Sequence, residues 1–202
     1  PKEYHQEGDV WTHTMAALDS LPASADLTLR WATLLHDSGK PETYKKAERI
    51  RFDSHSEASS QISVNILKRL CFSTKIINDV QWLTSHHMMM MPLLEMPKKR
   101  QIHWMQNPQF QNLLGLFEAD AKGTQPTDLS LYEAIKKHYS ELNEEHHKSI
   151  QPFFTGQQIM EITGIKPGPE LGKVMNELFE LQLDGHLNTQ EDARNWLLKK
   201  IT

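Results

Sequence analysis

Side chains of the types that bind divalent metals recur between residues 13 and 120 of the chain, and they are the residues best suited to chemistry. In chain order they are His13, His36, Asp37, His55, His86, His87 and Asp120. Imidazole and carboxylate groups without thiolates suit Mn, Fe, Ni, Co, Zn or Mg. The His36-Asp37 pair ends an apolar helical run, Leu34-Leu35. These two adjacent side chains could bind one divalent metal ion together.

The number of candidate ligands favours two ions over one. Seven ligands exceed what one tetrahedral ion accepts, but they fit two octahedral ions about 3.5–4 Å apart. To one ion we assign His13, His36, Asp37 and Asp120. To the other we assign His55, His86 and His87. Asp37 has two carboxylate oxygens and is expected to bridge the ions, which would share a water acidified to hydroxide and directed at phosphorus.

Lys40 follows Asp37 by three residues, and these two residues are the expected catalytic pair. The ammonium group of Lys40 could contact a phosphate oxygen, which makes it the candidate substrate-binding residue. An equally weighted alternative is a lysine at a helix C-terminus that interacts with the helix dipole. The sequence leaves both interpretations open.

Apolar residues recur at helical spacing, and no convincing alternating strand pattern is present, which predicts an all-α protein. The expected N-cap residues are Asp9, Asp26, Ser54, Ser73, Asn107, Thr155 and Thr189. Ser54 and Thr155 are each followed three residues later by Glu or Gln, which indicates capping boxes. Pro108 is expected at the first position of its helix.

Four of the expected helices each carry a ligand-type residue along or beside an apolar face. These residues are His13, the His36-Asp37 pair, His87 and Asp120. Burying such groups without partners would cost several kcal/mol, and a shared metal would remove that cost. The pattern therefore predicts that the ligands face inward together.

The length of 202 residues allows one domain with an appendage or two small domains. A change of composition at residues 149–152 predicts a boundary, with a metal-binding domain over residues 1–148 and a small helical region over residues 149–202. The net charge of −4 indicates no general attraction to nucleic acid or membrane. We interpret the basic clusters as solvated faces.

Other features of the composition favour a cytoplasmic protein without a membrane span. No apolar run approaches the roughly 20 residues needed to cross a bilayer. The single cysteine, Cys71, leaves no disulfide framework, and we expect it in the core. We expect the run of four methionines at residues 88–91 to fill the core or to form a pocket wall.

The ligand series resembles the signature of the HD-domain metal-dependent phosphohydrolases. His13, His36-Asp37 and Asp120 match the four-residue signature of this family. His55 and His86-His87 resemble the additional histidines of its binuclear members, which include cyclic-dinucleotide phosphodiesterases. The resemblance implies an HD-domain helical bundle with divalent metal and hydrolysis of phosphate esters.

The flanking sequence is similar to a particular branch, the HD and C-terminal regions of bacterial CCA-adding tRNA nucleotidyltransferases and poly(A) polymerases. The similar segments are residues 5–14, 34–41, 118–121, 154–156, 164–172 and 183–185. We find no nucleotidyltransferase head, with its glycine-rich turn and paired carboxylates, and expect no nucleotide addition by this chain alone. The activities that the resemblance then implies are 2′,3′-cyclic phosphodiesterase, 2′-nucleotidase and phosphatase action on a nucleotide or related ester.

A second hypothesis is a non-catalytic, tRNA-binding fragment or accessory region of such a polymerase. Basic patches such as Lys98-Lys99-Arg100 motivate it, and it predicts salt-sensitive RNA binding without turnover. The seven candidate ligands favour the phosphohydrolase over the binding fragment, because RNA binding alone does not require a metal site. The sequence leaves the substrate, the metal and the oligomeric state open.

Overall fold

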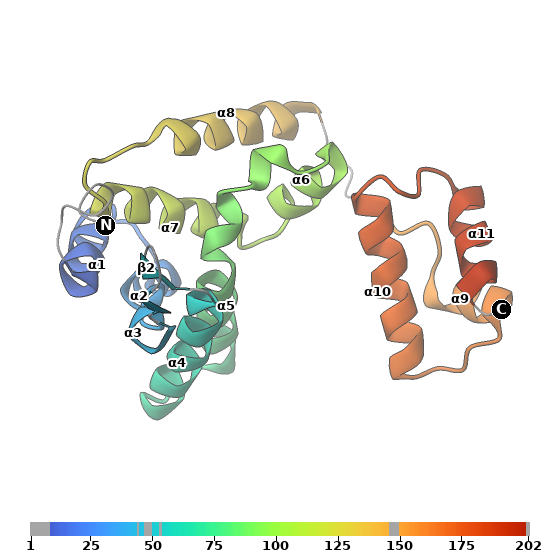
Figure 1. Ribbon diagram of the computed structural model, residues 1–202, viewed down its shortest axis with the longest axis horizontal. Helices are drawn as coiled ribbons and strands as arrows, with labels where there is room; N and C mark the ends of the chain where they lie inside the picture. Colours follow the sequence, from blue (N-terminus) through green and yellow to red (C-terminus); the bar gives the residue numbers. More distant parts are fainter. Residues whose placement is uncertain (1–8, 44, 47–49, 53, 146–149, 201–202) are drawn as a thin grey trace. The chain divides into compact units, whose positions relative to one another are not determined.

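A computed structural model describes residues 9–43, 45–46, 50–52, 54–145 and 150–200 (Figure 1). These residues form a helical bundle, which confirms the all-α prediction. The exception is a short antiparallel pair, β1 (Lys45–Lys46) and β2 (Ile50–Arg51), in which Lys45 pairs with Arg51. Strands of two residues are too short to leave an alternating pattern in the sequence. In the described part of the chain, no helix has the length and apolar character needed to cross a membrane.

The chain divides into two compact units. The first comprises residues 1–93 and 108–140, and the second comprises residues 94–107 and 141–202. The second unit thus includes α6 (Lys98–Met105) as well as the C-terminal helices. A change of composition near residue 149 could not indicate that residues 94–107 belong to the second unit. The assignment of functions to residues 1–148 and 149–202 stays a prediction.

The first unit is built around α2 (Leu27–Leu35), which packs against four other helices. These neighbours are α1 (Val10–Asp19), α4 (His55–Arg69), α5 (Thr74–His86) and α7 (Phe110–Gly123). The short helix α3 (Lys40–Thr43) follows α2 and packs on α4. The 3₁₀ turns η1 (His87–Met90) and η2 (Leu93–Glu95) follow α5, and α8 (Ser130–Glu145) follows α7. The central position of α2 brings the residues at its C-terminal end inside the bundle.

The second unit has its own apolar core, formed by α9 (Gly156–Thr163), α10 (Pro169–Leu183) and α11 (Gln190–Lys200). The buried core residues are Ile159, Val174, Leu178, Leu187, Ala193 and Leu197. Arg100 of α6 binds α10, with Nε 2.6 Å from Asp184 Oδ1 and a guanidinium nitrogen 2.5 Å from Glu180 Oε2. This unit therefore combines an apolar centre with a charged contact at its surface.

Most of the predicted helix starts are confirmed. The side chains of Asp9, Asp26 and Ser73 accept hydrogen bonds from the first turns of α1, α2 and α5. Thr155 forms the predicted capping box with Gln158. Thr189 accepts a hydrogen bond from the N–H of Asp192 at the start of α11.

Two predicted caps are wrong. Ser54 precedes α4, but its backbone is left-handed, with φ of 64°, and its side chain makes no cap hydrogen bond. A standard cap requires an extended backbone at this position. Asn107 does not begin α7, because its N–H donates to Trp104 O at the end of α6. Gln109 precedes α7, so Pro108 lies in the turn before the helix.

The predictions for Cys71 and the methionine run also need correction. Cys71 is exposed rather than in the core, and it lies at φ 57° just after α4. Met90 is fully buried, whereas Met88 and Met91 are exposed. A 3₁₀ turn places every third residue on the same face. His87 and Met90 therefore share the inner face of η1, and Met88 and Met91 share an outer one.

Candidate metal centre

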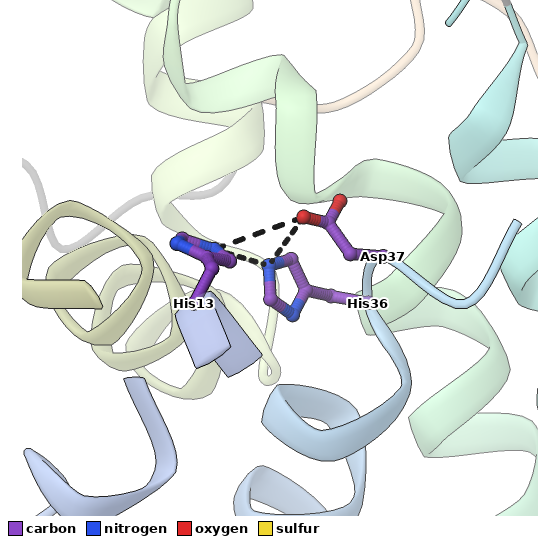
Figure 2. A group of neighbouring side chains, drawn as sticks. All are labelled: His13, His36 and Asp37. Carbon is purple, nitrogen blue, oxygen red and sulfur yellow. Dashed lines mark hydrogen bonds and ion pairs between the residues drawn. The ribbon is translucent and has the colours of Figure 1, made fainter. Parts of the chain in front are cut away.

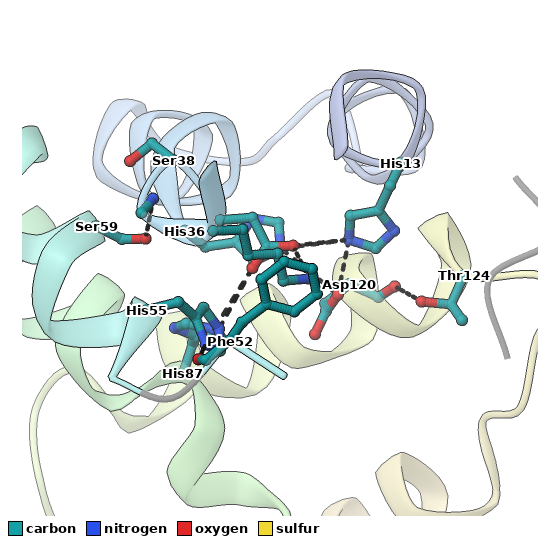
Figure 3. Close-up of polar contacts among 12 residues, drawn as sticks. His13, His36, Ser38, Phe52, His55, Ser59, His87, Asp120 and Thr124 are labelled. Atoms are coloured by element: carbon teal, nitrogen blue, oxygen red, sulfur yellow. Dashed lines mark hydrogen bonds and ion pairs between the residues drawn. The ribbon is translucent and has the colours of Figure 1, made fainter. Parts of the chain in front are cut away.

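Six of the seven predicted ligands meet at the C-terminal end of α2. His36 and Asp37 directly follow α2, His13 comes from α1, and Asp120 comes from α7. His55 is the first residue of α4, and His87 is the first residue of η1. Five separate segments of the first unit thus contribute to one cluster, as Figure 3 shows.

The two carboxylate oxygens of Asp37 face different pairs of histidines. Oδ2 lies 3.4 Å from Nε2 of His36 and 3.7 Å from Nε2 of His13 (Figure 2). Oδ1 lies 3.5 Å from Nε2 of His55 and 3.9 Å from Nε2 of His87. This is the arrangement that a carboxylate bridging two cations requires.

Asp120 completes the first half of the cluster. Its Oδ1 lies 2.9 Å from Nε2 of His13 and 3.5 Å from Nε2 of His36, and the two Nε2 atoms are 3.4 Å apart. Adjacent ligands of an ion with bond lengths of about 2.1 Å are separated by about 3.0–3.5 Å. The donor spacing of this half therefore fits a divalent cation.

Three of the histidine rings are held by backbone carbonyls three residues earlier in the chain. Nδ1 lies 2.8 Å from Thr33 O in His36, 2.9 Å from Phe52 O in His55 and 2.7 Å from Thr84 O in His87. A carbonyl oxygen only accepts, so each Nδ1–H donates, and in the neutral ring Nε2 keeps the lone pair. Such outer hydrogen bonds orient histidine ligands in metal sites.

The carbonyls that orient these rings were not predicted from the sequence. Thr33 and Thr84 lie near the C-terminal ends of α2 and α5, where the last carbonyls lack helical partners. A histidine three residues later can use such a carbonyl, so Thr-x-x-His at a helix end was an available signal. Phe52 lies in a loop and offered no comparable signal.

The second half of the cluster also fits a cation. The Nε2 atoms of His55 and His87 are 3.0 Å apart. Burial, together with the nearby charge of His36, lowers the pKa of His87 to about 4, so its ring is neutral near pH 7. With Nδ1–H donating to Thr84 O, the neutral ring of His87 turns its Nε2 lone pair toward His55, where it can be donated to a cation.

The carboxylates of the first half stabilise positive charge at His36, so a metal ion bound there would displace the His36 proton. Burial opposes a charged His36, but the charge of Asp37 and the hydrogen bond and charge of Asp120 outweigh it and raise its pKa to about 9. Burial also opposes ionisation of Asp37, yet the charges of His36 and Lys40 hold the pKa of its carboxyl below the usual value. Asp37 is therefore ionised, as a bridging ligand must be.

The cluster is buried except along one edge. The most exposed of His13, His36, Asp37, His55 and His87 is His55, at 8 %. The side chain of Asp120 is 30 % exposed, and that of Lys40 is 16 % exposed. The Lys40 ammonium group contacts Asp37 Oδ2 and lies 5.7 Å from the centre of the Phe52 ring. Asp120 and Lys40 are therefore the most exposed side chains of the cluster.

His86 is the predicted ligand that the structure does not bring into the cluster. Its Nδ1 lies 2.7 Å from Trp82 O and 2.8 Å from Ser85 Oγ, and its ring stacks on Trp82 at 4.6 Å between centroids. Neither of the two potential ligand groups among the described residues includes it. Consecutive residues at the α5–η1 junction point in different directions, so only one of the two histidines reaches Asp37.

The comparisons with known proteins agree with this site. The family profile of the HD domain matches residues 10–121, more than half of the chain. The matched region contains all six converging residues. The protein therefore belongs to the HD-domain family, which is part of a superfamily of metal-dependent phosphohydrolases.

The chain is also similar to tRNA nucleotidyltransferases. It is 31% identical over 198 residues to the A-adding tRNA nucleotidyltransferase of Deinococcus radiodurans, covering 92% of this chain and 45% of the relative. It is 29% identical over 204 residues to the CC-adding enzyme of Thermus thermophilus, covering 96% and 46%. The chain thus spans about half the length of these curated relatives. No solved structure matches significantly.

Proposed function

We propose that the protein is a metal-dependent phosphohydrolase acting on a nucleotide or a related phosphate ester, as a phosphatase, 2′,3′-cyclic phosphodiesterase or 2′-nucleotidase. The observation that supports this most strongly is the position of Asp37, whose two oxygens face two separate pairs of histidines. Divalent cations bound there would supply Lewis acidity, making a water nucleophilic near neutral pH and neutralising charge on the phosphate.

The protein's own groups would orient the metal ligands and exclude bulk water from the site. The carbonyls of Thr33, Phe52 and Thr84 fix three imidazole rings so that Nε2 faces the carboxylate of Asp37. Burial of the ligands keeps bulk water away from these groups and strengthens their electrostatic interactions with the substrate.

Lys40 is proposed to hold a phosphoryl oxygen. Its ammonium group neighbours Asp37 and belongs to the exposed edge, so it can exchange part of its contact with Asp37 for a substrate phosphate. The alternative, a lysine interacting with the dipole of a helix, has less support because Lys40 is the first residue of α3.

The test is phosphate release from p-nitrophenyl phosphate, its bis-ester and 2′,3′-cyclic AMP by protein supplied with Mn²⁺, Co²⁺ or Mg²⁺. We expect metal-dependent turnover that falls at least about 100-fold in Asp37→Ala, since one substitution removes a ligand from both halves. His186→Ala, at an exposed histidine of the second unit, is the matched control and should keep the wild-type rate. Equal rates in Asp37→Ala and wild type would refute the proposal.

A second candidate function is RNA binding within a tRNA nucleotidyltransferase, which the names of both relatives favour. It predicts tRNA affinity that falls steeply with salt and is unchanged in Asp37→Ala. Affinity that stays constant between low and high salt would count against it. Because the assays are independent, either function can be found without the other.

A further inference from the structure

At two glycines, segments that carry candidate metal ligands pack so closely that there is no space for a side chain between them. Gly39 follows Asp37 by two residues and packs on the first turns of α4, while Gly123 follows Asp120 by three residues and packs on α1. Each contact joins two ligand-bearing segments, and together they involve both halves of the candidate metal centre.

The contact at Gly39 leaves no room for a side chain. A Cβ there would lie 2.5 Å from His55 O, 2.6 Å from Ser59 N and 2.7 Å from Ala58 Cβ. Two of these atoms are backbone atoms and cannot rotate away. The Gly39 N–H also donates to Ser59 Oγ at 2.9 Å, and Ser59 is fully buried. This contact therefore fixes the start of α4, and His55 with it, relative to Asp37.

The contact at Gly123 is almost as close. A Cβ there would lie 2.9 Å from His13 O and 3.0 Å from both the N and the Cβ of Ala17. His13 O belongs to the backbone of a ligand residue, so a methyl group at Gly123 would move α1 away from α7. The separation of these helices sets the 2.9 Å distance between His13 Nε2 and Asp120 Oδ1.

We propose that Gly39 and Gly123 are positioning residues that each control one half of the metal centre. Gly39 keeps Asp37 within reach of His55, and Gly123 keeps His13 within reach of Asp120. The proposal rests on the proposed function in so far as that function requires bound metal. It goes beyond that function, because it assigns the geometry of each half of the metal centre to a different glycine.

Another glycine of α7 provides a matched control. A Cβ at Gly115 would meet only the methyl ends of Leu29, at 3.1 and 3.7 Å. A leucine side chain can shift by a few tenths of an ångström, whereas backbone atoms cannot. Gly115→Ala therefore adds the same methyl group to the same helix as Gly123→Ala without separating two ligand-bearing segments.

The first experiment measures metal content and the Mn²⁺ electron paramagnetic resonance spectrum of purified variants. We expect two exchange-coupled ions in wild type and in Gly115→Ala. Gly39→Ala should bind one isolated ion, and Gly123→Ala should bind the ion of the His13–Asp120 half about 10- to 100-fold more weakly. Folded Gly39→Ala that holds two coupled ions with wild-type affinity would overturn the proposal.

A second experiment needs no metal and separates this proposal from the proposed function. Imidazole NMR signals of the metal-free protein should move for His55 in Gly39→Ala, and for His13 in Gly123→Ala. If wild type binds no metal, the proposed function fails, while this readout still tests the glycines. Should Gly39→Ala not fold, Ser59→Ala, which removes the hydrogen-bond acceptor of Gly39, must shift His55 selectively. Signals unchanged from wild type would refute the role of Gly39.

Discussion

Oδ1 of Asp37 lies 3.5 Å from Nε2 of His55, on the side of the carboxylate opposite His36. His55 begins α4, whereas Asp37 directly follows α2, so the relationship depends on how these two segments pack. The proposed hydrolase needs both sides of this carboxylate, one for each cation. Substitutions on the two sides should therefore have different effects.

His87→Ala and His86→Ala should behave differently although the residues are adjacent. Only the Nε2 of His87 faces Asp37, while His86 stacks on Trp82. We expect His87→Ala to bind one ion per chain and His86→Ala to bind two, as measured by elemental analysis after dialysis. Loss of an ion in His86→Ala would restore the seven-ligand assignment.

Asp37→Asn should affect both ions at once. The amide keeps the shape of the side chain but removes the negative charge that favours cations in both halves. We expect affinity for each ion to fall by at least about 10- to 100-fold, measured by isothermal titration calorimetry. Retention of one ion at wild-type affinity would show that Asp37 is not a shared ligand.

The sequence predicted which side chains converge better than it predicted how they are oriented. Residue types and order predicted His13, His36, Asp37 and Asp120 as ligands, and the structure brings these side chains together. The sequence could not tell which member of the His86-His87 pair turns inward, since that depends on the change from α-helix to 3₁₀ turn after His86.

Local signals predicted helix starts well where side chain and backbone agreed, as at Asp9 and Asp26. They failed at Ser54, where the backbone is left-handed and the side chain makes no cap hydrogen bond. The need for a glycine at position 39 was equally hidden, because the atoms that exclude a side chain belong to α4 and become neighbours only in the folded chain.

Lys40→Met should impair catalysis while leaving metal binding intact. The Lys40 ammonium group contacts Asp37 Oδ2 and so competes with a cation for that oxygen. We expect kcat/KM for phosphate esters to fall about 10- to 100-fold, a loss of roughly 1.4–2.7 kcal/mol of transition-state stabilisation, with metal affinity equal to or above that of wild type. Weaker metal binding with an unchanged kcat/KM would assign Lys40 a structural role instead.

The contact between Arg100 and Asp184 should make the stability of the second unit depend on pH. The hydrogen bond and charge of Arg100 hold the pKa of Asp184 below its usual value. A lowered folded-state pKa stabilises the fold above the unfolded pKa of about 3.9, and this contribution is lost as pH falls through the folded value.

Urea unfolding of wild type and Arg100→Gln tests this dependence. The partly exposed contact should contribute at most about 1 kcal/mol at pH 6, and the difference between the proteins should shrink toward pH 3. Lys99→Gln is the control, because Lys99 binds the neutral side chain of Asn188 and its effect should not vary with pH in this range. A difference for Arg100→Gln that is constant with pH would contradict the assignment.

The most direct test of the central claim is anomalous diffraction from crystals of the protein grown with Mn²⁺. The proposed centre predicts two anomalous peaks about 3.5–4 Å apart, one on the Oδ2 side of Asp37 beside His13, His36 and Asp120, and one on the Oδ1 side beside His55 and His87. A single peak, or peaks that do not contact Asp37, would contradict a centre bridged by this carboxylate.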